Sequence, residues 1–144
     1  MAFAYIGHRG SATTTTANTT LAATVATDNI AAGRVVVVRA STYAVAAETG
    51  ATTGHSVSDS QGNTYTRLAE YTHAGTLGVT VSLHYSVLAT GLTTDTDTVT
   101  LTSPSLSRRV LAIEEFSAGA TVAATAFAGN YGTSGVLSAS LADL

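Results

Sequence analysis

The stretch Asp59-Ser60-Gln61-Gly62-Asn63-Thr64-Tyr65 lies near the middle of the chain and predicts a tight turn that begins a β-strand. Gly62 and Asn63 tolerate a positive φ, and the short side chain of Asp59 can accept hydrogen bonds from nearby backbone amides. The residues after the turn alternate, as strand residues do. We therefore assign Asp59, Gly62 and Asn63 a structural role in this turn.

A calcium loop is the alternative for the same residues. Asp and Asn side chains supply the hard oxygen ligands that Ca²⁺ prefers, and Asp28 is one further donor. Ca²⁺ takes about six to eight oxygens, however, and these three side chains do not provide them. We therefore favour a turn held by hydrogen bonds from side chain to backbone, and we expect neither a metal nor another cofactor.

Short segments rich in β-branched residues lie on both sides of this turn. Four consecutive valines, Val35–Val38, favour an extended backbone and predict a central strand covered on both faces. Turn residues separate such segments, and no apolar segment with helical periodicity lies between them. The expected strands are Phe3–Ile6, Thr20–Ala26, Arg34–Ala40, Tyr65–Tyr71, Val79–Val87, Thr98–Thr102 and Arg109–Phe116, with one more after Ser117. The predicted fold class is all-β, a single-domain antiparallel β-sandwich or barrel of about seven to nine short strands.

Local patterns predict how some of these strands are oriented and where they end. Apolar and polar residues alternate along Val79–Val87, so we expect the apolar side chains to face the core and the polar ones, including His84, to face solvent. Pro104 is expected to end the strand Thr98–Thr102, because proline lacks the N–H that a strand ladder needs. The low-complexity run Ser11–Thr16 is expected to be an exposed loop.

The composition excludes several classes of function. The chain has 144 residues, which fits one domain, and no cysteine, so it has no disulfide framework, thiolate metal site or thiol nucleophile. Its six basic residues are all arginine, and a net charge of −3 provides no basic surface for nucleic acid or an anionic membrane. We see neither a signal peptide nor an apolar run of about 18 residues, which a membrane span needs. Only 10% of the residues are charged, so the surface suits packing against copies of the chain or another protein.

Five segments resemble, in their order and residue types, the markers of a known group of domains. They are Ala32–Val38, Asp59–Tyr65, His84–Tyr85, Asp97–Thr102 and Ala112–Gly119. The chain is similar in these segments to the jelly-roll β-sandwich domains of bacteriophage virion proteins. The resemblance implies a jelly-roll-like sandwich that serves as a capsid decoration (cement) protein or as a minor head or tail protein. Such domains often continue with further strands, so either a neighbouring chain completes the sandwich or this is a minimal version of it.

Glu114 and Glu115 are adjacent on a predicted strand, so their side chains must point to opposite faces. They cannot form the side-by-side pair of carboxyl groups that glycoside hydrolysis needs. A buried carboxylate must be paired with a partner. We therefore expect a structural ion pair with Arg39, Arg67 or Arg109.

The other polar and aromatic residues show no recognisable catalytic pattern. The four histidines, His8, His55, His73 and His84, lack the spacing of a zinc site, and no Gly-x-Ser-x-Gly sequence marks a serine nucleophile. A sugar-stacking platform is one use for the tyrosines Tyr43, Tyr65, Tyr71 and Tyr85, but we expect them to pack in the core with their hydroxyls bonded at the rim. We therefore predict that the protein is not an enzyme.

The resemblance and the charge-poor surface together predict a capsid decoration protein. It would be made in the host cytoplasm and would bind the outside of the capsid. Its partners would be other copies of itself, in a homotrimer, and the major capsid protein. No nucleic acid or membrane partner is expected. Residues 1–20 are expected to form an N-terminal arm or first strand that exchanges between subunits, and residues 21–144 the sandwich. The expected contact residues are Phe3, Tyr5, Ile6, His8 and Arg9. The alternative is a carbohydrate-binding or adhesion module of a phage tail or bacterial surface protein.

Overall fold

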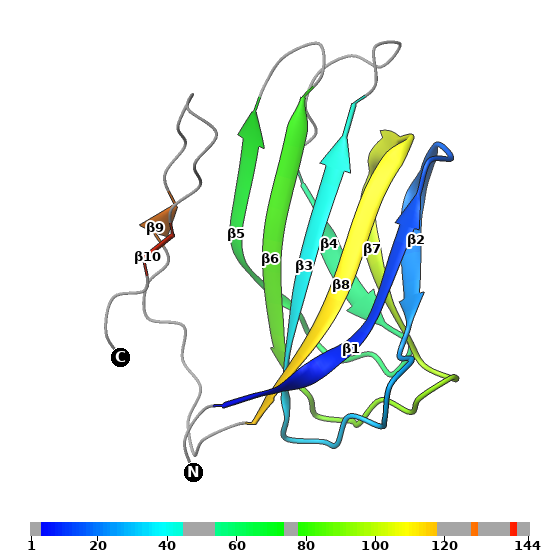
Figure 1. Ribbon diagram of the computed structural model, residues 1–144, viewed down its shortest axis with the longest axis vertical. Coiled ribbons are helices and arrows are strands. Elements are labelled where there is room, and N and C mark those ends of the chain that lie inside the picture. Colours follow the sequence, from blue (N-terminus) through cyan, green and yellow to red (C-terminus); the bar gives the residue numbers. More distant parts are fainter. Residues whose placement is uncertain (1–3, 45–53, 74–77, 118–127, 130–138, 141–144) are drawn as a thin grey trace.

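The computed structural model describes residues 4–44, 54–73, 78–117, 128–129 and 139–140, and every regular element in these ranges is a β-strand (Figure 1). The strands are β1 (Ala4–Thr14), β2 (Asn18–Thr24), β3 (Val35–Tyr43), β4 (Ser56–Asp59), β5 (Thr66–His73), β6 (Val79–Val87), β7 (Thr98–Leu106), β8 (Arg108–Ser117), β9 (Ala128–Gly129) and β10 (Ala139–Ser140). No helix long and apolar enough to cross a membrane occurs among these residues.

The first eight strands form two sheets that face each other. The larger sheet has the order β1-β8-β3-β6-β5 and the smaller one the order β2-β7-β4, with antiparallel neighbours throughout. Figure 1 shows the five-stranded sheet in front, with β4 and β7 behind it. β9 and β10 pair with each other in a separate two-residue ladder.

The strand pairing is nested, as in a long hairpin rolled into two layers. β1 pairs with β8, β2 with β7 and β3 with β6, which is the arrangement of a jelly roll. β4 and β5 depart from it, because they pair with β7 and β6 rather than with each other. The predicted fold class, an all-β antiparallel jelly-roll-like sandwich, is confirmed.

The hydrophobic core lies between the two sheets. β3 is a central strand, with β8 on one side and β6 on the other, and its residues Val36 and Val38 are fully buried. The predicted central position of this strand is thus confirmed; on its outer face Val35 is buried and Val37 is half-buried. The core consists of Leu21, Ala23, Val25, Ile30, Val36, Val38, Ala40, Leu88, Leu92, Val99, Leu101, Leu111 and Ile113.

The predicted orientation of β6 is wrong, because its polar residues face the core. Thr80, Ser82, His84 and Ser86 are buried, whereas Val81 and Val87 are 38% and 46% exposed. The pairing with β3 explains this: Ser86 lies opposite Val36 and His84 opposite Val38, and directly paired residues point to the same face. Because Val36 and Val38 face inward, their partners Ser86 and His84 also face inward, and the alternate, apolar residues of β6 face outward.

Two predicted strand boundaries are also wrong. β1 continues through Thr14, so much of the run Ser11–Thr16 is strand rather than loop. β7 continues through Pro104 to Leu106. β4 pairs with β7 only as far as Thr102, and the pairing of β2 with β7 is irregular beyond that point, so the missing N–H of proline interrupts no regular ladder. Residues 4–14 thus form the first strand. For residues 1–20 the sequence predicted either an N-terminal arm or a first strand.

β1 carries two register shifts, and glycine allows the backbones to approach closely at one of them. The shifts lie between Tyr5 and Gly7 and between His8 and Gly10. A Cβ atom at Gly10 would lie 2.3 Å from the carbonyl oxygen of Thr24, whereas a Cβ at Gly7 would have no neighbour closer than 3.8 Å. Gly10 therefore permits β1 to cross β2.

The substitution Gly10→Ala is expected to lower the free energy of unfolding by about 2 kcal/mol, because the methyl group forces two backbones apart. Gly7→Ala, in the same strand, is the matched control and is expected to change it by less than about 0.5 kcal/mol. Urea unfolding followed by circular dichroism measures both values. Equal effects of the two substitutions would contradict the close approach at Gly10.

Candidate functional site

The Asp59 carboxylate is saturated by donors from its own turn. Oδ1 accepts the backbone N–H groups of Gln61 and Asn63, both at 3.0 Å, and Oδ2 accepts the side-chain amide of Asn63 at 2.9 Å and the hydroxyl of Tyr65 at 3.0 Å. Gly62 has a φ of 74°. Since donors surround the carboxylate, this geometry fits the predicted turn and not a calcium loop. In the described ranges, no three His, Asp or Glu side chains gather so as to hold a metal ion.

A second carboxylate, Asp97, fastens the turn to the rest of the sandwich. Its oxygens accept the hydroxyl of Ser60 at 2.6 Å, the side-chain amide of Gln61 at 2.8 Å and the backbone N–H of Thr93 at 2.7 Å. These hydrogen bonds lower the pKa of Asp97 below its usual value. In the sequence, Asp97 directly precedes the predicted strand Thr98–Thr102, but no local pattern showed that it would meet Ser60.

Glu114 forms a polar cluster on the outer face, by which we mean the side of the five-stranded sheet turned away from the smaller sheet. Its carboxylate accepts the hydroxyl of Tyr5 at 3.0 Å, contacts Nδ1 of His8 at 3.2 Å and pairs with Arg39. Burial alone would raise the pKa of Glu114, but the hydrogen bonds from Arg39, His8 and Tyr5 outweigh burial and lower it. The cluster joins two predicted contact residues, Tyr5 and His8, to a predicted ion pair.

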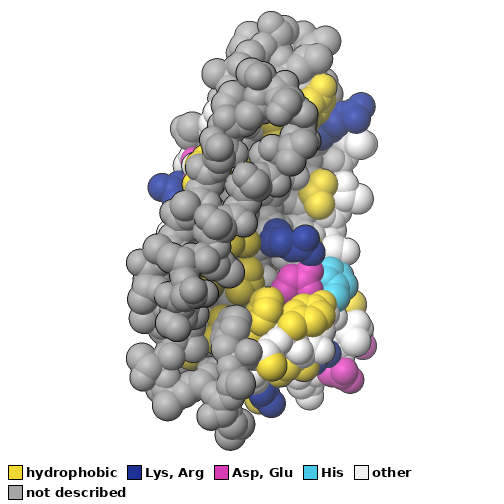
Figure 2. All heavy atoms as spheres, turned by 60° about the vertical axis from the view of Figure 1, so that its left-hand side comes forward, with side chains coloured by type: hydrophobic (Ala, Val, Ile, Leu, Met, Phe, Trp, Pro, Cys, Tyr) yellow, Lys and Arg dark blue, Asp and Glu magenta, His cyan; other side chains and the backbone are white. Residues whose placement is uncertain are grey.

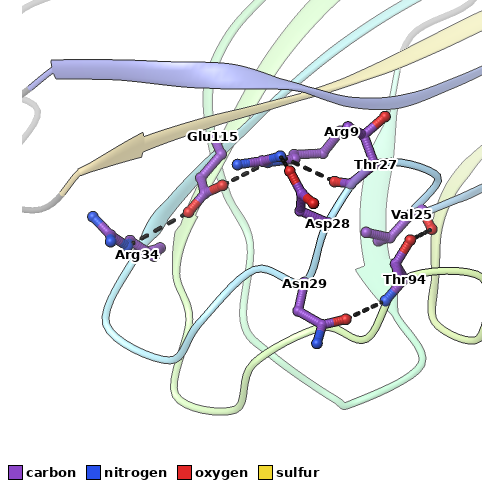
Figure 3. Close-up of polar contacts among 8 residues, drawn as sticks. All are labelled: Arg9, Val25, Thr27, Asp28, Asn29, Arg34, Thr94 and Glu115. Atoms are coloured by element: carbon purple, nitrogen blue, oxygen red, sulfur yellow. Dashed lines mark hydrogen bonds and ion pairs between the residues drawn. The ribbon is translucent and has the colours of Figure 1, made fainter.

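Glu115 points into the sandwich, as its alternation with Glu114 predicted. Its Oε2 pairs with Nε of Arg9 at 2.6 Å, and its Oε1 lies 3.5 Å from Nε of Arg34. Arg9 also donates to a carboxylate oxygen of Asp28 and to the carbonyl of Thr27, both at 3.0 Å. Figure 3 shows Arg9 between Glu115 and Asp28, with a further link between Asn29 and Thr94 nearby.

Arg9 must therefore be removed from the predicted contact residues. It is only 8% exposed, and its guanidinium is occupied within its own chain. Of the predicted ion-pair partners, Arg39 is confirmed. Arg67 instead pairs with Glu70 at 2.9 Å, and Arg109 donates to the carbonyl of Thr16 at 2.9 Å.

A second polar cluster lies inside the sandwich, where β6 turns its polar residues inward. The hydroxyl of Ser82 lies 2.8 Å from Nδ1 of His55 and 3.2 Å from Nε2 of His84, and Nε2 of His55 lies 3.1 Å from the hydroxyl of Thr42. Burial lowers the pKa of both histidines, that of His84 to about 4. Glu70 bonds the backbone N–H of His55 rather than its ring. Among the described residues, no carboxylate is hydrogen-bonded to either imidazole ring, whereas a catalytic triad requires one.

The outer face carries two rows of mainly apolar side chains. Pairing registers place Val110, Ser41, Val81 and Tyr71 in one row across β8, β3, β6 and β5, and Ala112, Arg39, Leu83 and Ala69 in the next row. These rows line a shallow groove of about 500 Å³. Figure 2, which brings the left-hand side of Figure 1 forward, shows hydrophobic side chains beside a small group of acidic, histidine and arginine side chains.

The exposed contact residues of the prediction, Tyr5, Ile6 and His8, lie on β1 at the edge of the same sheet, next to the Glu114 cluster. Tyr5 and Ile6 are 59% and 40% exposed at the start of β1, and the ring of Tyr5 meets that of Phe116 edge-on at 5.4 Å. Phe3 lies outside the described residues. We call Tyr5 and Ile6 the β1 patch. Among the described strands β1 is at the edge of the sheet, so a partner can approach the patch without displacing any of them.

The fold and these surfaces define an all-β sandwich whose outer face combines an apolar groove, a carboxylate cluster and an exposed apolar patch. No protein-family model, curated protein or solved structure matches the chain. The likeness to phage virion domains therefore stays a prediction from the sequence.

Proposed function

We propose that this chain is a non-enzymatic structural protein of a bacteriophage virion, a decoration protein that binds the outer surface of the capsid. It would join neighbouring subunits of the major capsid protein. Because it would bind the assembled shell and not the separate subunits, its binding energy would stabilise the shell. The capsid is proposed as the partner because the sequence resembles the jelly-roll domains of virion proteins. The jelly-roll-like pairing of the strands agrees with that resemblance.

The observation that carries the proposal is the β1 patch, an exposed aromatic and an exposed aliphatic side chain on an edge strand of a charge-poor chain. Large apolar residues exposed together mark surfaces that bind other proteins. Tyr5 is also held in place by its hydroxyl bond to Glu114, so little side-chain entropy is lost when a partner covers it.

Self-association is the second part of the proposal. Most homo-oligomers close by rotational symmetry, and we propose a trimer, which would suit the three-fold positions of a capsid. Sedimentation velocity of the purified protein measures the mass directly.

Binding to phage particles tests the proposal. The particles come from the genome that encodes the chain, with this gene deleted. The wild-type protein is expected to bind them saturably and to raise the temperature at which they release DNA. The double variant Tyr5→Ser/Ile6→Ser is expected to bind at least about tenfold more weakly, a loss of about 1.4 kcal/mol, with an unchanged unfolding temperature.

The control for this experiment is Val110→Ser, which removes an equally exposed apolar side chain at the groove end of the sheet. It is expected to bind like the wild type. Absence of wild-type binding would overturn the decoration role, and equal binding by the double variant would overturn the β1 patch as its surface.

A carbohydrate-binding or adhesion module is the second candidate, and Tyr71 favours it. Tyr71 is 38% exposed rather than packed in the core as predicted, and it lines the groove, where its ring could stack on a sugar. Binding of the purified protein to a glycan array, lost in Tyr71→Ala, would support this candidate.

A further inference from the structure

The two arginines at the start of β8, Arg108 and Arg109, differ from the other four in their electrostatic surroundings. Each of the others is paired with an aspartate or a glutamate: Arg9, Arg34, Arg39 and Arg67. Among the described residues, no carboxylate forms an ion pair with Arg108 or Arg109. Two adjacent positive charges therefore have no countercharge in the described part of a chain whose net charge is −3.

Arg109 is buried and points toward the smaller sheet. It is 2% exposed, and its guanidinium donates to the carbonyl oxygens of Thr16 and Thr20. Its Nε has no hydrogen-bond partner among the described residues. The carbonyls solvate the guanidinium but do not neutralise it, and burial lowers its pKa. Because arginine stays protonated in proteins, a positive charge that water barely screens lies inside this end of the sandwich.

Arg108 is exposed and lies on the outer face of the same strand. It pairs with Tyr43 of β3, and its guanidinium lies over the Tyr43 ring, 5.9 Å from the ring centre. This cation–π contact holds the guanidinium in place without neutralising its charge. Because the contact uses the face of the guanidinium, the N–H groups at its edge remain available to a ligand.

The two arginines line one pocket of about 350 Å³. The end of β1 supplies threonines to it, because Thr13 pairs with Val110 and Thr14 with Arg109. Figure 1 shows β1 ending beside the start of β8. The remaining lining residues are Thr15, Tyr43 and Val110. Hydroxyl groups and a guanidinium, with no carboxylate among the described lining residues, provide hydrogen-bond donors for an anion.

This lining suits a doubly charged oxyanion. A guanidinium presents its N–H groups in a planar fork that matches the oxygens of a phosphate. The hydroxyl of Thr14 accepts the backbone N–H of Thr16 at 3.1 Å, so its own hydrogen is left to donate to a ligand. A dianion would balance both unpaired arginines, whereas a carboxylate would balance one of them and a neutral sugar neither.

We propose that this pocket binds a phosphate group, held by the guanidinium of Arg108 and by the threonines at the end of β1, with the buried charge of Arg109 behind it. The pocket lies at the opposite end of β8 from the β1 patch, because Tyr5 pairs with Phe116. This inference therefore does not depend on the decoration role.

An NMR titration of the full-length, ¹⁵N-labelled protein with inorganic phosphate tests the proposal. At about pH 8 phosphate carries close to two negative charges. Sodium chloride is replaced in step to keep the ionic strength constant, so that general screening does not change. The backbone amides of Thr13, Thr14 and Thr15 and the Nε–H of Arg108 are expected to shift saturably, with a dissociation constant of roughly 1 to 10 mM.

Two arginine variants show whether the binding is specific to the pocket. Arg108→Gln is expected to bind phosphate at least about tenfold more weakly. Arg67→Gln removes an arginine that is also half exposed on the five-stranded sheet but lies outside the pocket, and it is expected to bind like the wild type. Circular dichroism checks that both variants keep the fold.

Thermal unfolding gives a second readout. A ligand that binds only the folded protein raises its unfolding temperature, and phosphate also stabilises proteins generally by exclusion from their surface. The general effect is the same in both variants, so the rise is expected to be smaller in Arg108→Gln than in Arg67→Gln. Equal rises, no saturable shifts at the pocket, or acetate binding as tightly as phosphate would each overturn the proposal.

Glycerol 3-phosphate separates the two sources of a phosphate group, the free ion and the end of a larger molecule. Affinity within about threefold of that for inorganic phosphate would assign the pocket to a phosphate ester. Clearly weaker binding of the ester would assign it to the free ion. Both results support a phosphate site.

Discussion

Replacing Glu115 by alanine is expected to lower the free energy of unfolding by about 3–5 kcal/mol, the usual effect of removing one partner of a buried ion pair. The substitution leaves the guanidinium of Arg9 buried without its nearest carboxylate, which lies 2.6 Å away in the native protein. Asp28 cannot replace it, because the side chain of Asp28 is largely exposed and its charge is screened by water. Chemical denaturation measures the effect.

Two variants show whether the loss comes from an unpaired charge. Asp28→Ala removes the exposed partner of the same guanidinium and is expected to cost less than about 1 kcal/mol. The double variant Arg9→Met/Glu115→Leu removes both charges and is expected to be clearly more stable than Glu115→Ala, since no buried charge is left alone. A Glu115→Ala protein no less stable than Asp28→Ala would contradict the buried pair.

The protein is expected to lose stability as the pH falls below about 6.5, because His84 is buried neutral in the fold. Burial, with smaller contributions from His55 and Arg67, lowers its pKa from 6.5 to about 4. The unfolded chain therefore binds a proton at a pH where the folded chain does not, so the stability is full above 6.5 and falls until about pH 4. The loss is expected to be about 2 kcal/mol at pH 5 and about 3 kcal/mol at pH 4.

The variant His84→Gln tests this effect. It removes one of two buried histidines and keeps His55, whose pKa burial also lowers, so the stability of the variant is expected to change less than that of the wild type between pH 6.5 and 5. That range lies above the titration of the carboxylates Glu70, Asp97 and Glu114, whose pKa values the fold lowers. Denaturant melts at several pH values measure the slope. A slope in His84→Gln equal to that of the wild type would contradict a neutral, buried imidazole.

Local sequence patterns predicted the parts of the fold that local physics decides. The four valines of β3 restrict their own backbone, and Gly62 and Asn63 permit the turn that Asp59 closes, so both features could be predicted without knowledge of the rest of the chain. The opposite directions of Glu114 and Glu115 follow from strand geometry alone.

Features that depend on distant partners could not be predicted in the same way. The alternation of apolar and polar residues in β6 predicts a strand. Which of the two sets of side chains faces the core is decided by the pairing with β3, some forty residues earlier in the chain. Arg9 meets Glu115 across β1 and β8, at opposite ends of the sandwich sequence, and nothing near Arg9 indicates a buried partner. The same holds for Ser82, which joins two histidines that the sequence separates.

The burial of Arg9 also narrows the candidate surface. With Arg9 held inside the sandwich, the exposed contact residues in the described part of the N-terminal segment are Tyr5, Ile6 and His8, whose side chain is 47% exposed although it contacts Glu114. A partner would therefore meet hydrophobic side chains at the edge of the sheet rather than a free positive charge.

Cryo-electron microscopy of intact particles from the genome that encodes this chain is the most direct test of a virion role. We predict copies of the sandwich on the outer surface of the capsid, with Tyr5 and Ile6 against the major capsid protein. A capsid exterior without density for the sandwich, in particles from which the protein is also missing by mass spectrometry, would contradict that role.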